Sequence, residues 1–180
     1  MFKFLNLAKN RRSIRSYQDE KISKEEINKI IEAGLWAPSA WNKQLIKFFV
    51  LENKEKIKQA SAEIAKLKQK FKLGKIREIA DPVFYQAPQV VFLCINEKEA
   101  HDLSYIDSSL VLQNCLLQAE ELDLATVIIG HANLLEKNSE LKKNIGFPQD
   151  WRILIAFCLG KTSLKPEAPV RKAAEVLFKT

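Results

Sequence analysis

The sequence predicts an α+β fold. Apolar runs rich in β-branched and aromatic residues, such as QVVFLCI at residues 89–95 and WRILIAFCLG at residues 151–160, are typical of buried strands. Segments whose apolar residues recur at helical spacing separate these runs. The composition, 47% hydrophobic and 28% charged, is that of a globular protein. No repeat or internal linker interrupts the chain, so we expect a single domain over residues 1–180.

The first predicted helix covers residues 24–37. Ser23 and Glu26 have the spacing of a capping box, in which each side chain binds a free backbone amide at the start of a helix. Pro38 ends the helical pattern. A strand is expected at residues 46–51, followed by an amphipathic helix whose apolar positions run from residue 57 to residue 71, with Gly74 as its stop. The buried strand at residues 89–95 comes next.

The segment at residues 105–122 is apolar around most of its circumference. A helix with this pattern is either buried on several sides or lies in an interface between subunits. A strand at residues 125–130 ends in Gly130, and a helix at residues 134–145 is stopped by Gly146 and Pro148. The strand at residues 151–160 leads into a tail that contains the basic pair Arg171 and Lys172.

The charge and the reactive side chains narrow the possible functions. A net charge of +7 can attract nucleic acid, anionic membranes or phosphorylated ligands. It can also result from lysine-rich helix faces that are exposed to solvent. No apolar run has transmembrane length, and the N-terminal apolar stretch is too short for a signal peptide. Cys94, Cys115 and Cys158 lie in apolar runs without a CxxC pair, which predicts buried, reduced thiols in a cytoplasmic protein. The two histidines form no metal motif, and no Rossmann or P-loop glycine pattern is present.

The segment NRRSIRSY at residues 10–17 is rich in hydrogen-bond donors. In an extended chain Arg11, Ser13 and Arg15 point to one side, and Arg12 and Ile14 point to the other. Guanidinium groups and a hydroxyl on one face can bind a phosphate through charge-assisted hydrogen bonds. The same residues are also common in a solvated basic turn.

Two further segments have the residues of a binding site for a flat ligand. In WAPSAWNKQ, at residues 36–44, small residues let a ring approach the backbone, and Ser39, Asn42 and Gln44 offer donors and acceptors. An ordinary loop after a helix has the same residue types. The strand that ends in Gly130 offers backbone amides with room beside them, although a buried strand that stops at a turn has the same pattern.

Taken together in this order, these segments resemble the FMN-dependent nitroreductase family over nearly the whole chain. The resemblance rests on RRSIRSY, APSAWNKQ, APQVVFLC, YIDSSLVLQNCLLQAEELDLATVIIG, IGFPQDWRILIAFCLG and PVRKAAEVL. It implies a mixed or antiparallel central sheet flanked by helices, and an intertwined homodimer that binds neither nucleic acid nor membrane. It also implies FMN as the cofactor and NADH or NADPH as the electron donor. The implied reaction is the ping-pong reduction of nitroaromatics, quinones or similar small molecules through a hydride carried by flavin N5.

The resemblance also implies a role for individual residues. Arg11, Ser13 and Arg171 would hold the phosphate with Arg12 nearby, and Arg15 would face the pyrimidine edge of the flavin. The 38–44 loop would line the ring from the partner subunit, and the amides at the end of the strand would meet N5 and O4. No side chain is required as a catalytic acid or base, and no metal is expected. The residues expected to bind the cofactor are Arg11, Arg12, Ser13, Arg15, Pro38, Ser39, Ala40, Asn42, Gln44, Ile128, Ile129, Gly130 and Arg171.

The chain departs from the family pattern at several positions. Leu45 and Ile46 stand where the family often has Pro-Trp, and Ile129 stands where many members have an acidic residue. The LGLG that commonly precedes the third strand is LDLA here, and Asp123 can adopt the left-handed turn that a glycine would make. A dehalogenase, a flavin-fragmenting enzyme and a flavin-binding module without catalysis share the resemblance and remain alternatives. A basic nucleic-acid binder is a further alternative, but the aromatic residues are not interleaved with a basic stripe.

Overall fold

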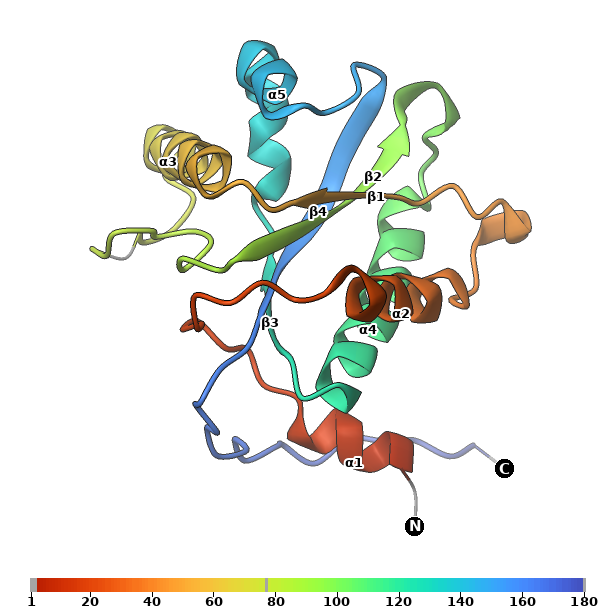
Figure 1. The fold of residues 1–180 in the computed structure, drawn as a ribbon. Helices are drawn as coiled ribbons and strands as arrows, with labels where there is room; N and C mark the ends of the chain where they lie inside the picture. Colours follow the sequence, from red (N-terminus) through yellow and green to blue (C-terminus); the bar gives the residue numbers. More distant parts are fainter. Residues whose placement is uncertain (1–2, 77, 180) are drawn as a thin grey trace.

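The computed structural model describes residues 3–76 and 78–179. Met1, Phe2, Arg77 and Thr180, which the expected single domain includes, lie outside the described residues. Helices cover both faces of a central sheet (Figure 1), which confirms the α+β class. The sheet has the strand order β1-β2-β4-β3, and every neighbouring pair of these strands is antiparallel. Its strands are β1 (Lys47–Leu51), β2 (Gln89–Asn96), β3 (Ala125–Ile129) and β4 (Trp151–Gly160).

Side chains alternate between two hydrophobic clusters, one on each face of the sheet. In β2, Val90 and Phe92 pack into one cluster, and Val91 and Leu93 pack into the other. This is the period-two pattern of a strand that is buried on both faces. The burial of β2 and β4 explains why both read as continuous apolar runs in the sequence.

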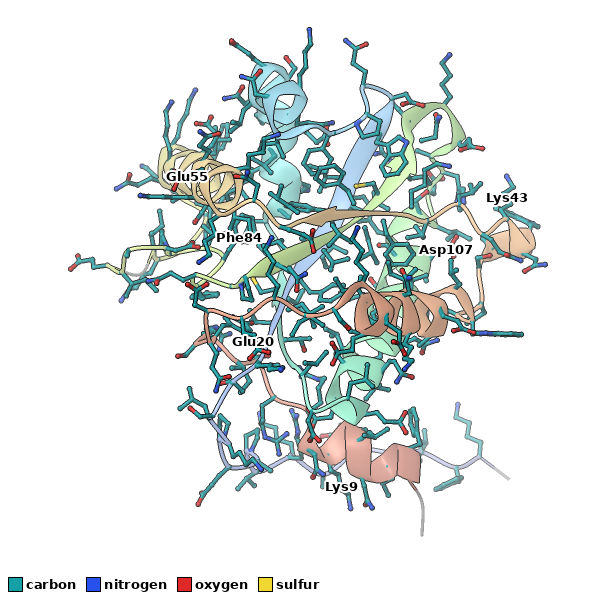
Figure 2. The ribbon with its side chains drawn as sticks, viewed as in Figure 1. Lys9, Glu20, Lys43, Glu55, Phe84 and Asp107 are labelled. Atoms are coloured by element: carbon teal, nitrogen blue, oxygen red, sulfur yellow. The ribbon has the colours of Figure 1, made fainter. Side chains whose placement is uncertain are left out.

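The helices divide between the two faces. On one face lie α2 (Lys24–Leu35) and α4 (Ser104–Glu121), and on the other lie α3 (Lys54–Lys70), η3 (Ala132–Lys137) and α5 (Ser139–Ile145) (Figure 1). Figure 2 shows the labelled Phe84, which is fully buried, between α3 and the sheet. The remaining elements are short: α1 (Lys3–Asn10), η1 (Ala40–Asn42) and η2 (Glu97–Glu99).

The predicted helix ends agree with the structure where the signal is local. Ser23 and Glu26 form the capping box at the start of α2, with Ser23 Oγ accepting from the Glu26 amide at 3.2 Å. Gly74 and Gly146 adopt left-handed φ values of 82° and 110° beyond α3 and α5. Asp123, between α4 and β3, has a φ of 55°, as its place in the sequence predicted.

Two helix predictions were wrong. The helix expected over residues 134–145 is split into η3 and α5 at Asn138, whose side chain accepts the Leu141 amide at 3.0 Å and caps a new helix start. An asparagine that binds a nearby amide in this way competes with continuous helix. The sequence analysis also missed α1, in which Phe4 is 69% exposed and Leu5 is 47% exposed. A short helix with so little burial has a weak pattern.

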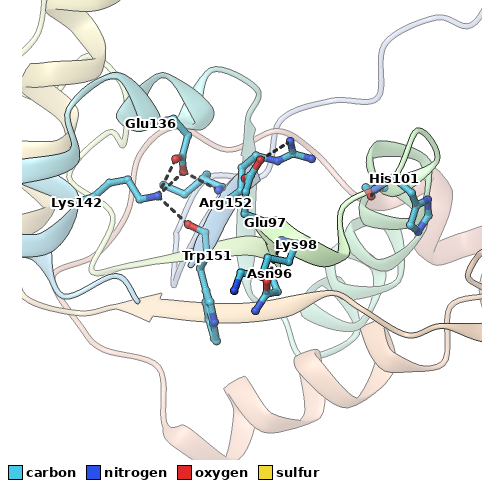
Figure 3. Close-up of polar contacts among 10 residues, drawn as sticks. Asn96, Glu97, Lys98, His101, Glu136, Lys142, Trp151 and Arg152 are labelled. Atoms are coloured by element: carbon cyan, nitrogen blue, oxygen red, sulfur yellow. Dashed lines mark hydrogen bonds and ion pairs between the residues drawn. The ribbon is translucent and has the colours of Figure 1, made fainter. Parts of the chain in front are cut away.

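A buried ion pair fixes η3 to β4. Lys142 Nζ donates to Glu136 at 2.7 and 2.8 Å and to the Trp151 carbonyl at 2.7 Å (Figure 3). Glu136 also accepts the Ile153 amide at 2.8 Å. These bonds satisfy a lysine that is only 8% exposed, so the cluster is structural.

Candidate functional site

Residues 11–15 lie along the outer edge of β3. The Ile14 amide donates to the Thr126 carbonyl at 2.9 Å, and Ser13 pairs with Thr126 in a parallel bridge. Ile14 is buried, whereas Ser13 and Arg15 are exposed. This is the alternation that the extended segment predicted.

Arg11 lacks an acceptor for part of its guanidinium group. Among the described residues, its Nη1 has no hydrogen-bond partner although the atom is buried. Burial is the main cause that lowers the pKa of Arg11; Glu120 raises this pKa, and repulsion by Arg12 and Arg171 lowers it further. Arg171, from the C-terminal tail, is thus one of the cations whose charge acts on Arg11. A buried donor among neighbouring cations is the arrangement that an anion would complete.

The Arg12 side chain donates hydrogen bonds to two backbone carbonyl groups. Its Nη1 donates to the Arg11 carbonyl at 2.7 Å and its Nε donates to the Glu167 carbonyl at 3.3 Å. It lines a pocket of about 720 Å³ together with Glu120 of α4 and with residues of the tail such as Lys165. Arg12 thus holds the tail that carries Arg171.

Arg15 projects from the same side as Ser13. Its Nη1 donates to the Ser13 carbonyl at 3.3 Å, and its guanidinium carbon lies 5.9 Å from the centroid of the Tyr85 ring. Tyr85 and Gln86 have φ values of 57° and 56°, which non-glycine residues seldom adopt. The sequence analysis did not include Tyr85 in the site.

The end of β3 is open to a ligand. Beyond its own chain neighbours, no atom of the described residues lies within 4 Å of a Cβ placed on Gly130. Ile128 is 41% exposed on one face of the strand, and Ile129 is buried on the other. The space expected beside Gly130 is therefore present next to the segment that carries Arg11, Ser13 and Arg15.

The 38–44 loop has an unusual backbone. Trp41, Asn42 and Gln44 have φ values of 52°, 54° and 51°. The Gln44 amide donates to Ser39 Oγ at 3.0 Å, and Gln44 Nε2 donates to Asn42 Oδ1 at 2.9 Å. Non-glycine residues in this region are strained and cluster at functional sites.

The structure does not bring this loop to the arginines within one chain. Figure 1 shows residues 11–15 beside β3, and the 38–44 loop beyond α2, at the opposite side of the fold. The loop residues Pro38, Ser39, Ala40, Asn42 and Gln44 are therefore separated from residues 11–15 within one chain.

Asp107 and His101 were also missed by the sequence analysis. Asp107 is 5% exposed, and its Oδ1 accepts the Ala40 amide at 3.0 Å. Figure 2 shows it on the side of the fold where Lys43 lies. A carboxylate inside the apolar 105–122 segment was the available signal, because a buried acidic residue requires a partner.

The three cysteines lie in the interior of the protein. Cys94, Cys115 and Cys158 are buried and unpaired, and burial raises the pKa of Cys94 and of Cys115 to about 12. No group of three or more His, Cys, Asp or Glu in residues 3–76 and 78–179 is placed to hold a metal ion. None of the helices in these ranges combines the length and the hydropathy that a membrane span requires.

Comparison with known proteins places the chain in one family. The sequence model of the nitroreductase family matches residues 8–161. The chain is 30% identical over 159 residues to an Archaeoglobus fulgidus protein provisionally named NADH dehydrogenase/NAD(P)H nitroreductase, covering 87% of this chain and 83% of that protein. It is 28% identical over 168 residues to the NADPH-flavin oxidoreductase of Vibrio harveyi, covering 92% of this chain and 68% of that protein.

A solved structure has the same fold. It is the nitroreductase from Bacteroides fragilis, crystallised with bound FMN, and its TM-score against this chain is 0.81 at 21% sequence identity. The superposition covers 99% of this chain and 100% of that chain. The likeness of the folds and the match to the family over most of the sequence agree with each other. The chain belongs to the nitroreductase family.

Proposed function

We propose that this protein binds FMN and uses NAD(P)H to reduce small oxidised molecules. Relatives named NADPH-flavin oxidoreductase and FMN reductase [NAD(P)H] support a flavin-dependent oxidoreductase. The observation that carries the proposal is the buried, unpartnered Arg11 Nη1 with Arg171 nearby. This pair of cations provides a binding site for a phosphate group.

The residues of one chain fit the phosphate and one edge of FMN. Arg11, Ser13 and Arg171 hold the phosphate, and Arg12 acts indirectly by holding the tail. Arg15 lies toward the pyrimidine edge, and the backbone at Ile128, Ile129 and Gly130 faces the ring. This assignment is supported by the alignment of residues 11–15 with β3.

The partner subunit supplies the other half of the site. In the proposed homodimer, the partner's 38–44 loop lines the ring through Pro38, Ser39, Ala40, Asn42 and Gln44. The exposed surface supports such a dimer, because Trp36 is 82% exposed, Ile106 is 56% exposed and Leu110 is 40% exposed. Exposed apolar residues on neighbouring helices are typical of an interface.

The interface on α4 is narrower than the apolar pattern of the helix suggests. Val111, Leu112, Leu116 and Leu117 are buried within the chain itself. Val111, Leu112 and Leu116 belong to the core cluster between the sheet and α2, so they are not available to a partner. Ile106 and Leu110 remain for the dimer contact.

The side chains act by binding and orienting. When bound, FMN supplies the hydride chemistry at N5 of its ring, so the protein provides no acid or base side chain. The guanidinium group of Arg15 places positive charge at the pyrimidine edge. The open space beside Gly130 leaves room for the ring next to the backbone, which would hold the ring in place. NAD(P)H and the acceptor, a nitroaromatic or a quinone, occupy the site in turn in a ping-pong mechanism.

The test begins with the purified protein. We expect a flavin absorption spectrum, one FMN per chain, and oxidation of NADH or NADPH that depends on an added nitroaromatic or quinone. Parallel-line kinetics over a matrix of donor and acceptor concentrations would support the ping-pong mechanism. Bound FMN with no NAD(P)H oxidation by any acceptor would instead indicate a flavin-binding module. A colourless protein that FMN does not saturate would contradict the proposal.

A further inference from the structure

The strained 38–44 loop needs contacts that hold it. A left-handed conformation is unfavourable for a non-glycine residue, and it persists only where the surroundings fix it. Trp41, Asn42 and Gln44 adopt this conformation in one short segment. Ser39 Oγ binds one end of the segment from within the loop, at the Gln44 amide. Asp107 contacts the loop from outside, at the Ala40 amide.

Asp107 connects α4 to the loop. It lies in the first turn of α4 and is almost fully buried, and its Oδ1 accepts the Ala40 amide at 3.0 Å. A hydrogen bond to an ionised acceptor is stronger than one between neutral groups. Ala40 is the first residue of η1, so this bond sets where the left-handed segment begins.

His101 lies in the connection between β2 and α4 (Figure 3). Its Nδ1 accepts the Leu103 amide at 3.2 Å, which assigns the proton of the neutral imidazole to Nε2. Nε2 is buried without a hydrogen-bond partner among the described residues, 3.8 Å from Asp107 Oδ2. The ring also meets the edge of Trp41, with centroids 5.7 Å apart.

We propose that Asp107 and His101 are positioning residues that hold the 38–44 loop in the shape required by the cofactor of the partner subunit. Asp107 fixes the Ala40 amide. His101 places Nε2 3.8 Å from Asp107 Oδ2, beside the carboxylate, and its ring contacts Trp41. The inference rests on the proposed function, because it assigns to this loop the partner-side wall of the flavin site.

The test compares substitutions at these positions with a matched control. Asp107→Ala removes the acceptor, whereas Asp107→Asn retains an oxygen that can accept the Ala40 amide. His101→Ala removes the ring, and His101→Gln restores an amide donor near the position of Nε2. Asn114→Ala is the control, because Asn114 Nδ2 donates to the Ala33 carbonyl at 3.1 Å and joins α4 to α2 away from the loop.

The loop itself is measured by amide hydrogen exchange of residues 38–44. We expect faster exchange in Asp107→Ala and near wild-type exchange in Asp107→Asn and Asn114→Ala. FMN affinity is measured in parallel. Asp107→Ala should weaken FMN binding about tenfold, the lower end of the loss expected for a bond to a charged acceptor, and Asp107→Asn should recover most of the affinity. The visible circular dichroism of bound flavin should change in Asp107→Ala but not in Asp107→Asn or Asn114→Ala.

The outcomes separate this inference from the proposed function. Faster exchange in Asp107→Ala with unchanged FMN affinity and unchanged flavin dichroism would overturn the inference. Equal losses of affinity in Asp107→Ala and Asn114→Ala would also overturn it, because a general loss of stability would then explain both. His101→Ala should weaken binding in the same direction as Asp107→Ala, and no effect would remove His101 from the pair. If the wild-type protein binds no FMN, the proposed function fails, and the exchange rates alone then decide whether Asp107 holds the loop.

Discussion

The amide of Ile14 donates to the carbonyl of Thr126 at 2.9 Å, and this bond aligns the N-terminal arginines with the edge strand of the sheet. Ser13 and Thr126 form the adjoining bridge, so residues 11–15 run parallel to β3. The segment covers part of an edge that would otherwise present unpaired backbone groups. It also brings Arg11, Ser13 and Arg15 beside the strand that ends at Ile129.

Arg11→Ala should weaken the binding of FMN and leave the binding of riboflavin nearly unchanged. Arg11 faces the phosphate in the proposed site, and riboflavin has no phosphate. The loss of a charge-assisted hydrogen bond, about 1.5–3 kcal/mol, corresponds to a loss of FMN affinity of about ten- to a hundredfold. Fluorescence titration of both flavins measures the effect, and Arg152→Ala is the control for charge because Arg152 pairs with Glu97 away from residues 11–15 (Figure 3). Equal losses for FMN and riboflavin would show that Arg11 does not bind the phosphate.

The sequence predicted those features that depend on neighbouring residues. The capping box of Ser23 and Glu26 and the left-handed turn at Asp123 are local, and both are present. The alternation of Arg11, Ser13 and Arg15 needs only the period of an extended chain. These patterns suffice for the strands and for most helices.

The contacts that complete the site join distant parts of the chain. Asp107 binds Ala40 across 67 residues, and the register of α4 against the loop sets this pairing. Arg12 binds the Glu167 carbonyl across 155 residues, which no pattern in either segment predicts. The apolar pattern of residues 105–122 left open whether Val111 and Leu116 are buried in the chain or lie in a subunit interface, and the structure buries both in the core. Tertiary packing, which decided these features, has no local signature.

Ile106→Glu should weaken the dimer. Ile106 is 56% exposed on α4, and a charge at the centre of an apolar interface would be desolvated without a partner. Sedimentation over a range of protein concentrations should show a higher dissociation constant and a parallel loss of bound FMN. Phe71→Glu is the control, because Phe71 is a similarly exposed apolar residue, just after α3 on the other face. A stable monomer that retains one FMN per chain would contradict both the dimer and the shared site.

A mixed dimer tests which chain supplies which half of the site. The dimer combines Arg11→Ala in one chain with Asn42→Gly in the other. Glycine can keep the left-handed φ of Asn42, and the substitution removes only the side-chain amide. If the loop serves the cofactor of the partner subunit, one site of this dimer has both changes and the other has neither. Half of the sites should then bind FMN with wild-type affinity in a titration of the purified heterodimer. If each loop served its own chain, both sites would carry one change and no wild-type site would be observed.

Gly34→Ala should destabilise the packing of α2 against α4. A Cβ at Gly34 would lie 2.6 Å from Cys115 Sγ and 3.2 Å from Val111 Cγ1. The expected loss in the free energy of unfolding is about 1–3 kcal/mol, reduced by up to about 1 kcal/mol because alanine favours helix more than glycine does. Urea unfolding at a fixed protein concentration measures it. Adding Cys115→Ala removes the closest contact, so the double variant should be less destabilised than the sum of the two single variants; strict additivity would contradict the predicted clash.

Arg15→Ala should lower the two-electron reduction potential of the bound flavin. Arg15 projects from the same side as Ser13, with its guanidinium group over Tyr85, and the proposed site places it at the pyrimidine edge. Two-electron reduction can leave negative charge at N1 and O2 of that edge, so a cation there favours the reduced form over the neutral oxidised ring. If the interaction favours the reduced form by about 1.5–3 kcal/mol, the potential should fall by about 30–65 mV.

Arg11→Ala should change the potential far less, because the phosphate keeps its charge in both redox states and is remote from the ring. A spectroscopic redox titration of wild type, Arg15→Ala and Arg11→Ala decides the matter, with Arg15→Lys as the variant that retains the charge. Equal potentials for wild type and Arg15→Ala would place Arg15 on the phosphate or in solvent.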